Sequence, residues 1–164
     1  MLKNLFLCLF FFFAVLTINA QPGDKAWVND YIALLTTEQK TVLSNELQAL
    51  EDSVGSQVVV MIIDTLEGME ISDFSLLIAN SWGIGRKDYD DGVLILLSMK
   101  DRQMRIEVGL GLEKIIPNET AEDIIKNEMI PEFREQKFYE GLLAAVQRIK
   151  TLILNKRELI GDKN

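Results

Sequence analysis

The residues in this sequence that could do chemistry are carboxylates, and they are densest in the stretch Asp88-Tyr89-Asp90-Asp91-Gly92. Calcium and magnesium bind several carboxylate and carbonyl oxygens that converge on one point, and a glycine lets the backbone turn tightly around the ion. The spacing is not that of an EF-hand, because an apolar stretch follows where the bidentate glutamate should stand. We therefore predict a calcium or magnesium site at Asp88, Asp90 and Asp91. A solvated loop at the entrance to a strand is the alternative.

Chain direction places two more candidate ligands beside this loop. Two neighbouring strands joined by a short turn run antiparallel, so the second strand ends at the edge of the sheet where the first begins. Glu107, near the end of the returning strand, and Asn118, at the end of the following loop, could then face the aspartates across a small cleft. An exposed ion pair between Glu107 and Arg105 is the other explanation for this carboxylate.

Asp30 is the sixth candidate ligand. It lies among apolar neighbours, where a carboxylate needs a metal ion, an arginine or backbone N–H groups as its partner. Both a metal-binding role and a structural role fit this residue. If the chain is an enzyme, Asp30 and Glu107 are also the candidate catalytic residues, because either could position a water molecule for attack on a metal-bound phosphate ester.

Composition excludes several classes of site. The sequence has no histidine, and its single cysteine, Cys8, lies in the apolar N-terminal stretch. Histidine-dependent catalytic triads, the usual zinc sites and disulfides are therefore excluded for the rest of the chain. The net charge of −8 repels phosphate backbones, so we expect no nucleic acid partner. Divalent cations and envelope or membrane proteins with basic surfaces are the expected partners.

The stretch W-G-I-G-R at residues 82–86 is not expected to be a phosphate-binding loop. Such a loop places its glycines between a strand and the helix that follows, where free N–H groups point at the anion. Here the glycines follow a predicted helix and precede a strand, so they more simply end the helix. Arg86 and Lys87 are left as candidate contacts for an anion.

The first 20 residues predict export. Lys3 is their only charge, the run from Leu5 to Ile18 is apolar apart from Thr17, and Ala20 precedes a polar stretch. The run is shorter than the roughly 20 residues that span a bilayer. We predict a signal peptide at residues 1–20, cleavage after Ala20, and a periplasmic or secreted protein with no transmembrane helix in the mature chain. A retained signal anchor is the alternative, because Ile18 stands where a small residue is preferred.

Hydrophobic periodicity predicts an α/β domain at residues 24–154, followed by a polar tail at residues 155–164. After an extended segment at 27–35, helices are expected from Thr36 to Gly55, at 72–81, from Thr120 with a break or restart at Pro131, and at 138–152. Strands are expected at 57–63, 93–97 and 102–108. This order predicts a three-layer α/β/α sandwich around a small mixed sheet, with two parallel strands and a hairpin.

Five segments resemble the TPM-domain family, named for proteins of thylakoids, bacteria and nematode neuromuscular tissue. They occur in the family's order: V-N-D-Y-I-A-L-L-T at 28–36, W-G-I-G-R at 82–86, D-D-G-V-L-I-L-L at 90–97, R-I-E-V-G-L-G-L-E at 105–113, and I-P-E-F-R with F-Y-E-G at 130–141. The resemblance implies a Rossmann-like sandwich in a protein that is exported or attached to a membrane.

The resemblance does not imply one function. A plant member acts in photosystem II repair and has been assigned acid phosphatase activity, and a nematode member is a receptor accessory protein. Calcium has been seen in the acidic cleft of some members. This chain departs from the family in two ways: Asn118 stands where many relatives have an aspartate, and no transmembrane helix or glycine-rich tail follows the domain.

These observations together predict an exported, divalent-cation-binding interaction or accessory module of the cell envelope. One alternative is a metal-assisted acid phosphatase in which Asp90 and Asp91 hold the metal. The other is a metal-independent scaffold for a membrane complex. A phosphatase is the weaker expectation, because the chain has no histidine for acid–base work.

Overall fold

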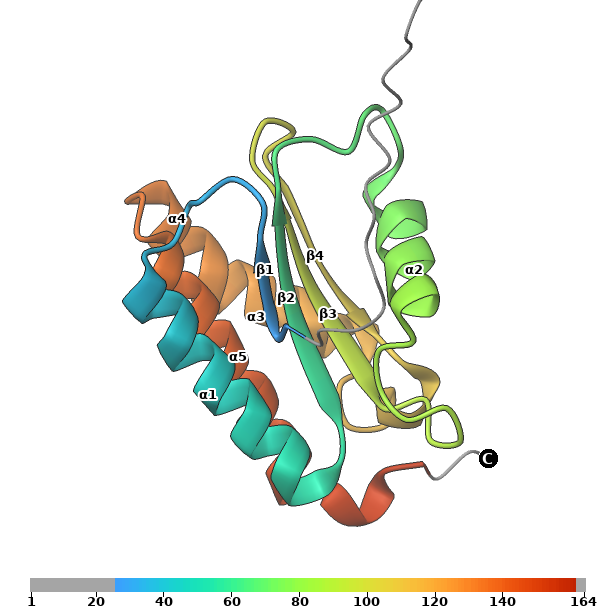
Figure 1. Ribbon diagram of the computed structural model, residues 1–164. Helices are drawn as coiled ribbons and strands as arrows, with labels where there is room; N and C mark the ends of the chain where they lie inside the picture. Colours follow the sequence, from blue (N-terminus) through green and yellow to red (C-terminus); the bar gives the residue numbers. More distant parts are fainter. Residues whose placement is uncertain (1–25, 162–164) are drawn as a thin grey trace, which may run out of the picture.

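The computed structural model describes residues 26–161, which form one four-stranded sheet packed between helices (Figure 1). The strands are β1 (Val28–Asp30), β2 (Gln57–Ile63), β3 (Gly92–Ser98) and β4 (Gln103–Val108). Their order in the sheet is β1-β2-β3-β4; the first three are parallel, and β4 is antiparallel to β3. The predicted mixed sheet with a hairpin is confirmed. The predicted signal peptide at residues 1–20 lies outside the described residues.

Helices cover both faces of this sheet. They are α1 (Thr37–Val54), α2 (Ile71–Trp82), α3 (Asn118–Ile124), α4 (Ile130–Arg134) and α5 (Phe138–Asn155), with short turns η1 (Leu110–Leu112), η2 (Ile125–Met129) and η3 (Arg157–Leu159). In Figure 1, α2 stands alone on one face, and α1, α3, α4 and α5 lie on the other. The three-layer, Rossmann-like α/β/α sandwich is therefore confirmed. No helix within residues 26–161 combines the length and the apolar character needed to cross a membrane.

The two central strands, β2 and β3, are buried along their whole length. They divide the core into two clusters, since their alternate side chains point to opposite faces. The smaller cluster lies under α2, and its buried members are Val59, Met61, Ile63, Leu66, Leu94 and Leu96. The larger cluster fills the other face. Continuous apolar runs are what strands covered on both faces require.

Helix α1 begins and ends where its sequence predicts. The Thr36 hydroxyl accepts from the Gln39 N–H at 3.2 Å, and the Gln39 side-chain oxygen accepts from the Thr36 N–H at 2.9 Å. Gly55 ends the helix in the left-handed conformation, with φ at 80°. Leu43 and Leu47 are buried against the sheet. The capping box and the glycine together fix the residues at which this helix begins and ends.

The extended segment predicted at residues 27–35 is much shorter in the structure. Only Val28–Asp30 is a strand, and it adds a third parallel strand that the sequence did not reveal. The backbone then turns, with Ala33 in the left-handed region at φ 54°. The cause is the Asp30 carboxylate, which accepts hydrogen bonds from the N–H groups of the next few residues and so curls the chain.

Pro131 does not break the helical path from Asn118 to Arg134. The turn before it is a π-helix, in which the N–H of Ile130 donates to the carbonyl of Ile125 five residues back. A proline in a regular α-helix clashes with the carbonyl four residues earlier. The wider π turn relieves this clash, so the chain continues into α4 rather than stopping.

The segment after α5 returns to the domain instead of forming only a polar tail. The η3 turn brings Leu159 and Ile160 against the larger core cluster. The N–H of Gly161 donates to the carbonyl of Gly111 at 3.3 Å. The C-terminal segment therefore lies beside the loops that lead into β3 and out of β4.

Candidate functional site

Asp91 is completely buried at the entrance to β3 and is bonded on both carboxylate oxygens. Oδ1 accepts from the backbone N–H of Arg86 at 2.7 Å. Oδ2 accepts from Arg86 Nε at 2.8 Å, from Arg86 Nη2 at 2.5 Å and from the Ser56 hydroxyl at 3.2 Å. A cation at Asp91 would have to displace the guanidinium. The structure therefore gives Asp91 the role of an anchor for Arg86.

The rest of the acidic loop packs against the loop after β4, as chain direction predicts. The carbonyl of Asp90 accepts from the N–H of Gly111 at 3.0 Å. A Cβ on Gly111 would lie 1.8 Å from the carbonyl oxygen of Tyr89, so only glycine fits there. Asp90 itself has a positive φ of 49°, and Asp88 is exposed. Backbone groups therefore hold the two loops together at this point.

Glu107 and Asn118 point to different surroundings. Glu107 faces α2, where it accepts from the Ser75 hydroxyl at 2.8 Å and from Arg105 Nε at 2.6 Å. Its side chain is 15% exposed, so this ion pair is largely covered. Asn118 is the exposed first residue of α3. The expected ion pair between Glu107 and Arg105 is present, but it is largely covered rather than exposed.

Asp30 lies at the opposite edge of the sheet from Asp91. Its carboxylate accepts from the N–H groups of Ile32 at 3.3 Å, Leu34 at 3.0 Å and Leu35 at 2.9 Å. Asp30 is in register with Ile62, whose partner on β3 is Leu97. Leu97 is five steps along the strand from Gly92, a distance of roughly 16 Å at 3.3 Å per residue. Asp30 therefore caps a backbone turn and cannot share an ion with Asp91.

The six predicted ligands do not form one cluster. Within residues 26–161, no group of three or more histidine, cysteine, aspartate or glutamate side chains is placed to hold a metal ion. Asp91 and Glu107 are committed to arginines, and Asp30 is committed to backbone N–H groups. Binding of calcium or magnesium by this chain stays a prediction, and the exposed Asp88 is the candidate ligand with the most open carboxylate.

Open α/β sheets commonly bind ligands at the carboxyl ends of their parallel strands. In this chain, polar side chains at that edge form hydrogen bonds around the hairpin turn. Asp101 accepts from the Ser98 hydroxyl and the Leu66 N–H, each at 2.6 Å. The Ser98 bond and then the Leu66 bond hold the pKa of Asp101 below its ordinary value. Lys100 donates to Asp64 at 2.5 Å, and this bond raises the pKa of Lys100. The carboxylates of Asp64 and Asp101 at this edge are therefore already bonded to neighbouring protein groups.

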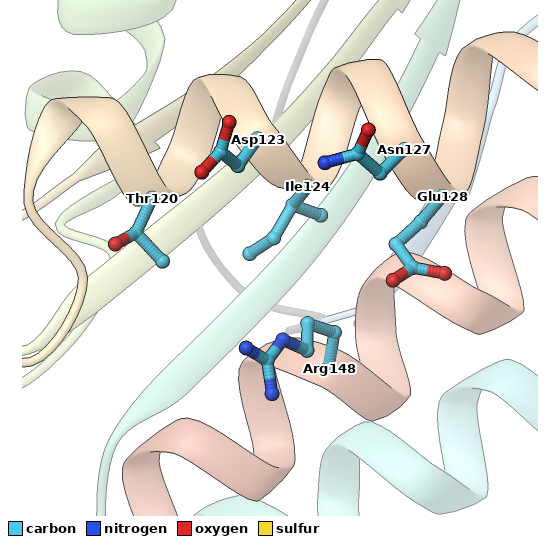
Figure 2. Close-up of a pocket in the computed structure, with 6 residues that line it drawn as sticks. All are labelled: Thr120, Asp123, Ile124, Asn127, Glu128 and Arg148. Atoms are coloured by element: carbon cyan, nitrogen blue, oxygen red, sulfur yellow. The ribbon is translucent and has the colours of Figure 1, made fainter.

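One pocket that the sequence did not reveal lies between the α3–η2 segment and α5. It has a volume of about 330 Å³ and is lined by Thr120, Asp123, Ile124, Asn127, Glu128 and Arg148. Figure 2 shows Arg148 on the facing helix, with the Asp123 carboxylate directed away from it. Within the described residues, none of the five polar side chains hydrogen-bonds to another. The helical spacing of the five lining residues at 120–128 was the available signal, but it equally describes a solvated polar face.

A second pocket, of about 250 Å³, is lined by Ser53, Val54, Arg86, Tyr89, Arg157 and Ile160. The guanidinium carbon of Arg86 lies 3.9 Å from the centroid of the Tyr89 ring, a cation–π contact. The sequence left Arg86 as a candidate anion contact but could not place Arg157 beside the same pocket. Only the return of the C-terminal segment brings the two arginines there. We call it the Arg86–Arg157 pocket.

The fold is a single-domain α/β/α sandwich, and both a protein family and solved structures match it. The model of the TPM domain matches residues 28–152, so the chain belongs to the TPM-domain family. This confirms the resemblance. A comparison with curated proteins gives no match.

Solved structures share the architecture. The N-terminal domain of a protein from P. gingivalis, solved by NMR, is 30% identical, covers 81% of this chain and 85% of its own, and has a TM-score of 0.75. The BA42 protein from the psychrophilic bacterium Bizionia argentinensis is 15% identical, with 77% and 86% covered and a TM-score of 0.67. The N-terminal domain of the cg2496 protein from Corynebacterium glutamicum is 13% identical, with 77% and 79% covered and a TM-score of 0.62. The last two show the fold alone.

Proposed function

We propose that this chain is an exported interaction module of the cell envelope that binds a protein partner through the outer surface of α2. The observation that carries this proposal is the exposure of apolar side chains on the one helix that covers its face of the sheet. Leu76 and Leu77 on α2 are 51% and 52% exposed, and Met69, just before the helix begins, is 44% exposed. Helical spacing places Leu76 and Leu77 opposite the stripe that packs on the sheet. The signal-like sequence at residues 1–20 supports export.

Charge on this surface indicates the kind of partner. Between Thr65 and Gly85 the chain has three acids, Glu67, Glu70 and Asp73, and no lysine or arginine. All three acids are exposed. An apolar centre flanked by carboxylates is complementary to a protein surface with apolar side chains surrounded by lysine and arginine. The partner is therefore expected to be a basic surface of an envelope or membrane protein.

Calcium or magnesium is a second candidate ligand, supported by the exposed carboxylate of Asp88 in the acidic loop. Calcium takes six to eight oxygen ligands. The described residues gather no three acidic side chains for this purpose, and Asp91 already neutralises Arg86. The interaction module is thus expected to fold without the metal. Thermal unfolding with and without calcium tests whether the metal binds, since an ion that binds only the native state raises the melting temperature.

A metal-assisted phosphatase has less support. It rests on the plant relative's assigned activity, and similarity of fold does not carry function with it. Its candidate catalytic residues, Asp30 and Glu107, lie toward opposite edges of the sheet and are bonded to protein groups. Phosphate ester turnover that is lost in an Asp90→Asn variant with unchanged melting temperature would favour the enzyme over the interaction module.

Site-specific photocrosslinking tests the proposed surface. A photoreactive amino acid at Leu77 is expected to form a discrete adduct with an envelope fraction of the same organism. Val42 is the matched control, because it is 44% exposed but lies on α1, on the other face of the sheet (Figure 1). The adduct at Leu77 should disappear when Glu70 and Asp73 are both changed to lysine. The same adducts at both positions, or none at Leu77, would contradict the proposal.

A further inference from the structure

We infer that the Arg86–Arg157 pocket is a binding site for a small organic monocarboxylate. The two guanidinium groups would hold the carboxylate, and Tyr89, Val54 and Ile160 would contact the apolar part of the ligand. This inference concerns the N-terminal edge of the parallel strands, away from the outer surface of α2. It is independent of the proposed partner surface.

Arg86 is held in place before any ligand arrives. Its Nε and Nη2 both bond to the buried Asp91 carboxylate, and its guanidinium stacks on Tyr89. A guanidinium has five N–H groups, of which Asp91 takes two. Within residues 26–161 no acceptor serves the other three, and the side chain is 40% exposed. A side chain fixed in this way binds an anion without first losing rotamer freedom.

Arg157 supplies the positive charge of the pocket, because Asp91 already neutralises Arg86. It follows α5 in the η3 turn, where it is exposed and has no ion-pair partner among the described residues. A carboxylate in the pocket would pair with the charge of Arg157 and accept hydrogen bonds from the N–H groups of Arg86 that Asp91 leaves open. Guanidinium–carboxylate pairs are often bidentate, which adds orientation to affinity.

The surroundings favour a monocarboxylate over a phosphate. The whole chain has a net charge of −8, and Asp88 and Asp90 flank Tyr89 in the same loop. This negative field opposes a doubly charged phosphate more than a singly charged carboxylate. The aromatic ring of Tyr89 and the aliphatic side chains of Val54 and Ile160 offer contact area that inorganic phosphate cannot use. A volume of about 250 Å³ limits the ligand to a small molecule.

The test is an NMR titration of the full chain with benzoate, with benzamide as the neutral molecule of matched shape and inorganic phosphate as the alternative anion. Benzoate is expected to shift the resonances of Tyr89 and the η3 turn, with weak binding on the order of 10 mM or tighter. Arg157→Gln should weaken binding roughly tenfold, because it removes a charge-assisted pair. Arg148→Gln, which changes an exposed arginine of the other pocket, should leave binding unchanged.

Substitution of Arg86 would disturb the buried Asp91, so Arg157 is the deciding position. Equal binding of benzamide and benzoate would overturn the inference, as would benzoate binding that Arg157→Gln does not weaken. Tighter binding of phosphate than of benzoate would overturn the assignment to carboxylates. No shift with benzoate at concentrations on the order of 50 mM would overturn the site itself.

Discussion

The side chain of Arg86 places both Nε and Nη2 within 2.8 Å of one carboxylate oxygen of Asp91, while its own backbone N–H holds the other oxygen. This is a closed ring of contacts within one short loop. Asp91 is fully buried, and its charge is neutralised by Arg86, whose side chain is 40% exposed. The pair fixes the loop that enters β3 and, through Arg86, one wall of a pocket.

Asp91→Asn should destabilise the fold by about 2 kcal/mol. Removal of one partner from a buried ion pair costs about 3–5 kcal/mol, and the lower value reflects the access of water to Arg86. Urea unfolding measures the change. Asp64→Asn, which removes an exposed ion pair with Lys100, is the control and should have little effect. Equal effects of the two substitutions would show that the Asp91 pair does not stabilise the fold.

Asp30→Ala should destabilise the fold by about 2 kcal/mol, because backbone N–H groups of the turn after β1 lose their acceptor. Asp30→Asn should cost less, since its amide oxygen can still accept. Urea unfolding of the two variants separates these values. A chelator of divalent ions is added to the chain without substitutions as a further comparison. If the chelator lowers its stability as much as Asp30→Ala does, Asp30 is a metal ligand, and its assignment as a cap of the turn is wrong.

Asp101 should make stability fall in acid. Hydrogen bonds from Ser98 and Leu66 lower its pKa below the ordinary 3.8, so the folded state holds the proton less tightly than the unfolded state. Its contribution is therefore present above that ordinary value and is lost as the pH falls through the lower pKa of the folded protein. Melting temperatures measured from about pH 6 to about pH 3 should decline less steeply for Asp101→Asn. Parallel declines would contradict this role.

Gly111→Ala should destabilise the fold by about 2 kcal/mol or more, because the new methyl group would lie 1.8 Å from the carbonyl oxygen of Tyr89. The loop must move, and Tyr89 must move with it. Gly68→Ala is the control: its backbone φ is 83°, but no atom lies within 4 Å of the added methyl group, so its cost should be near 1 kcal/mol. Differential scanning calorimetry compares the two, and equal effects would contradict close contact at Gly111.

Local signals in the sequence predicted most of the elements. The Thr36 capping box, the Gly55 stop and the apolar runs of β2 and β3 are short-range patterns, and each appears where it was expected. The short β1 strand was missed because its three residues carry no periodic pattern and depend on pairing with β2. The π turn before Pro131 was missed because a proline predicts a break or restart of a helix and gives no sign of a wider turn before it.

The sequence by itself determined which chemical groups and elements are present. The chain is acidic and has no histidine, its elements follow an α/β order, and a carboxylate-rich loop precedes a buried strand. Tertiary structure decided what each carboxylate does. Asp30 and Asp91 have the same side chain, yet one caps a turn and the other holds an arginine at the opposite edge of the sheet. The physical reason is that a buried charge takes its partner from whichever groups the fold brings within hydrogen-bonding distance, and these are set by strand register and loop packing over the whole chain.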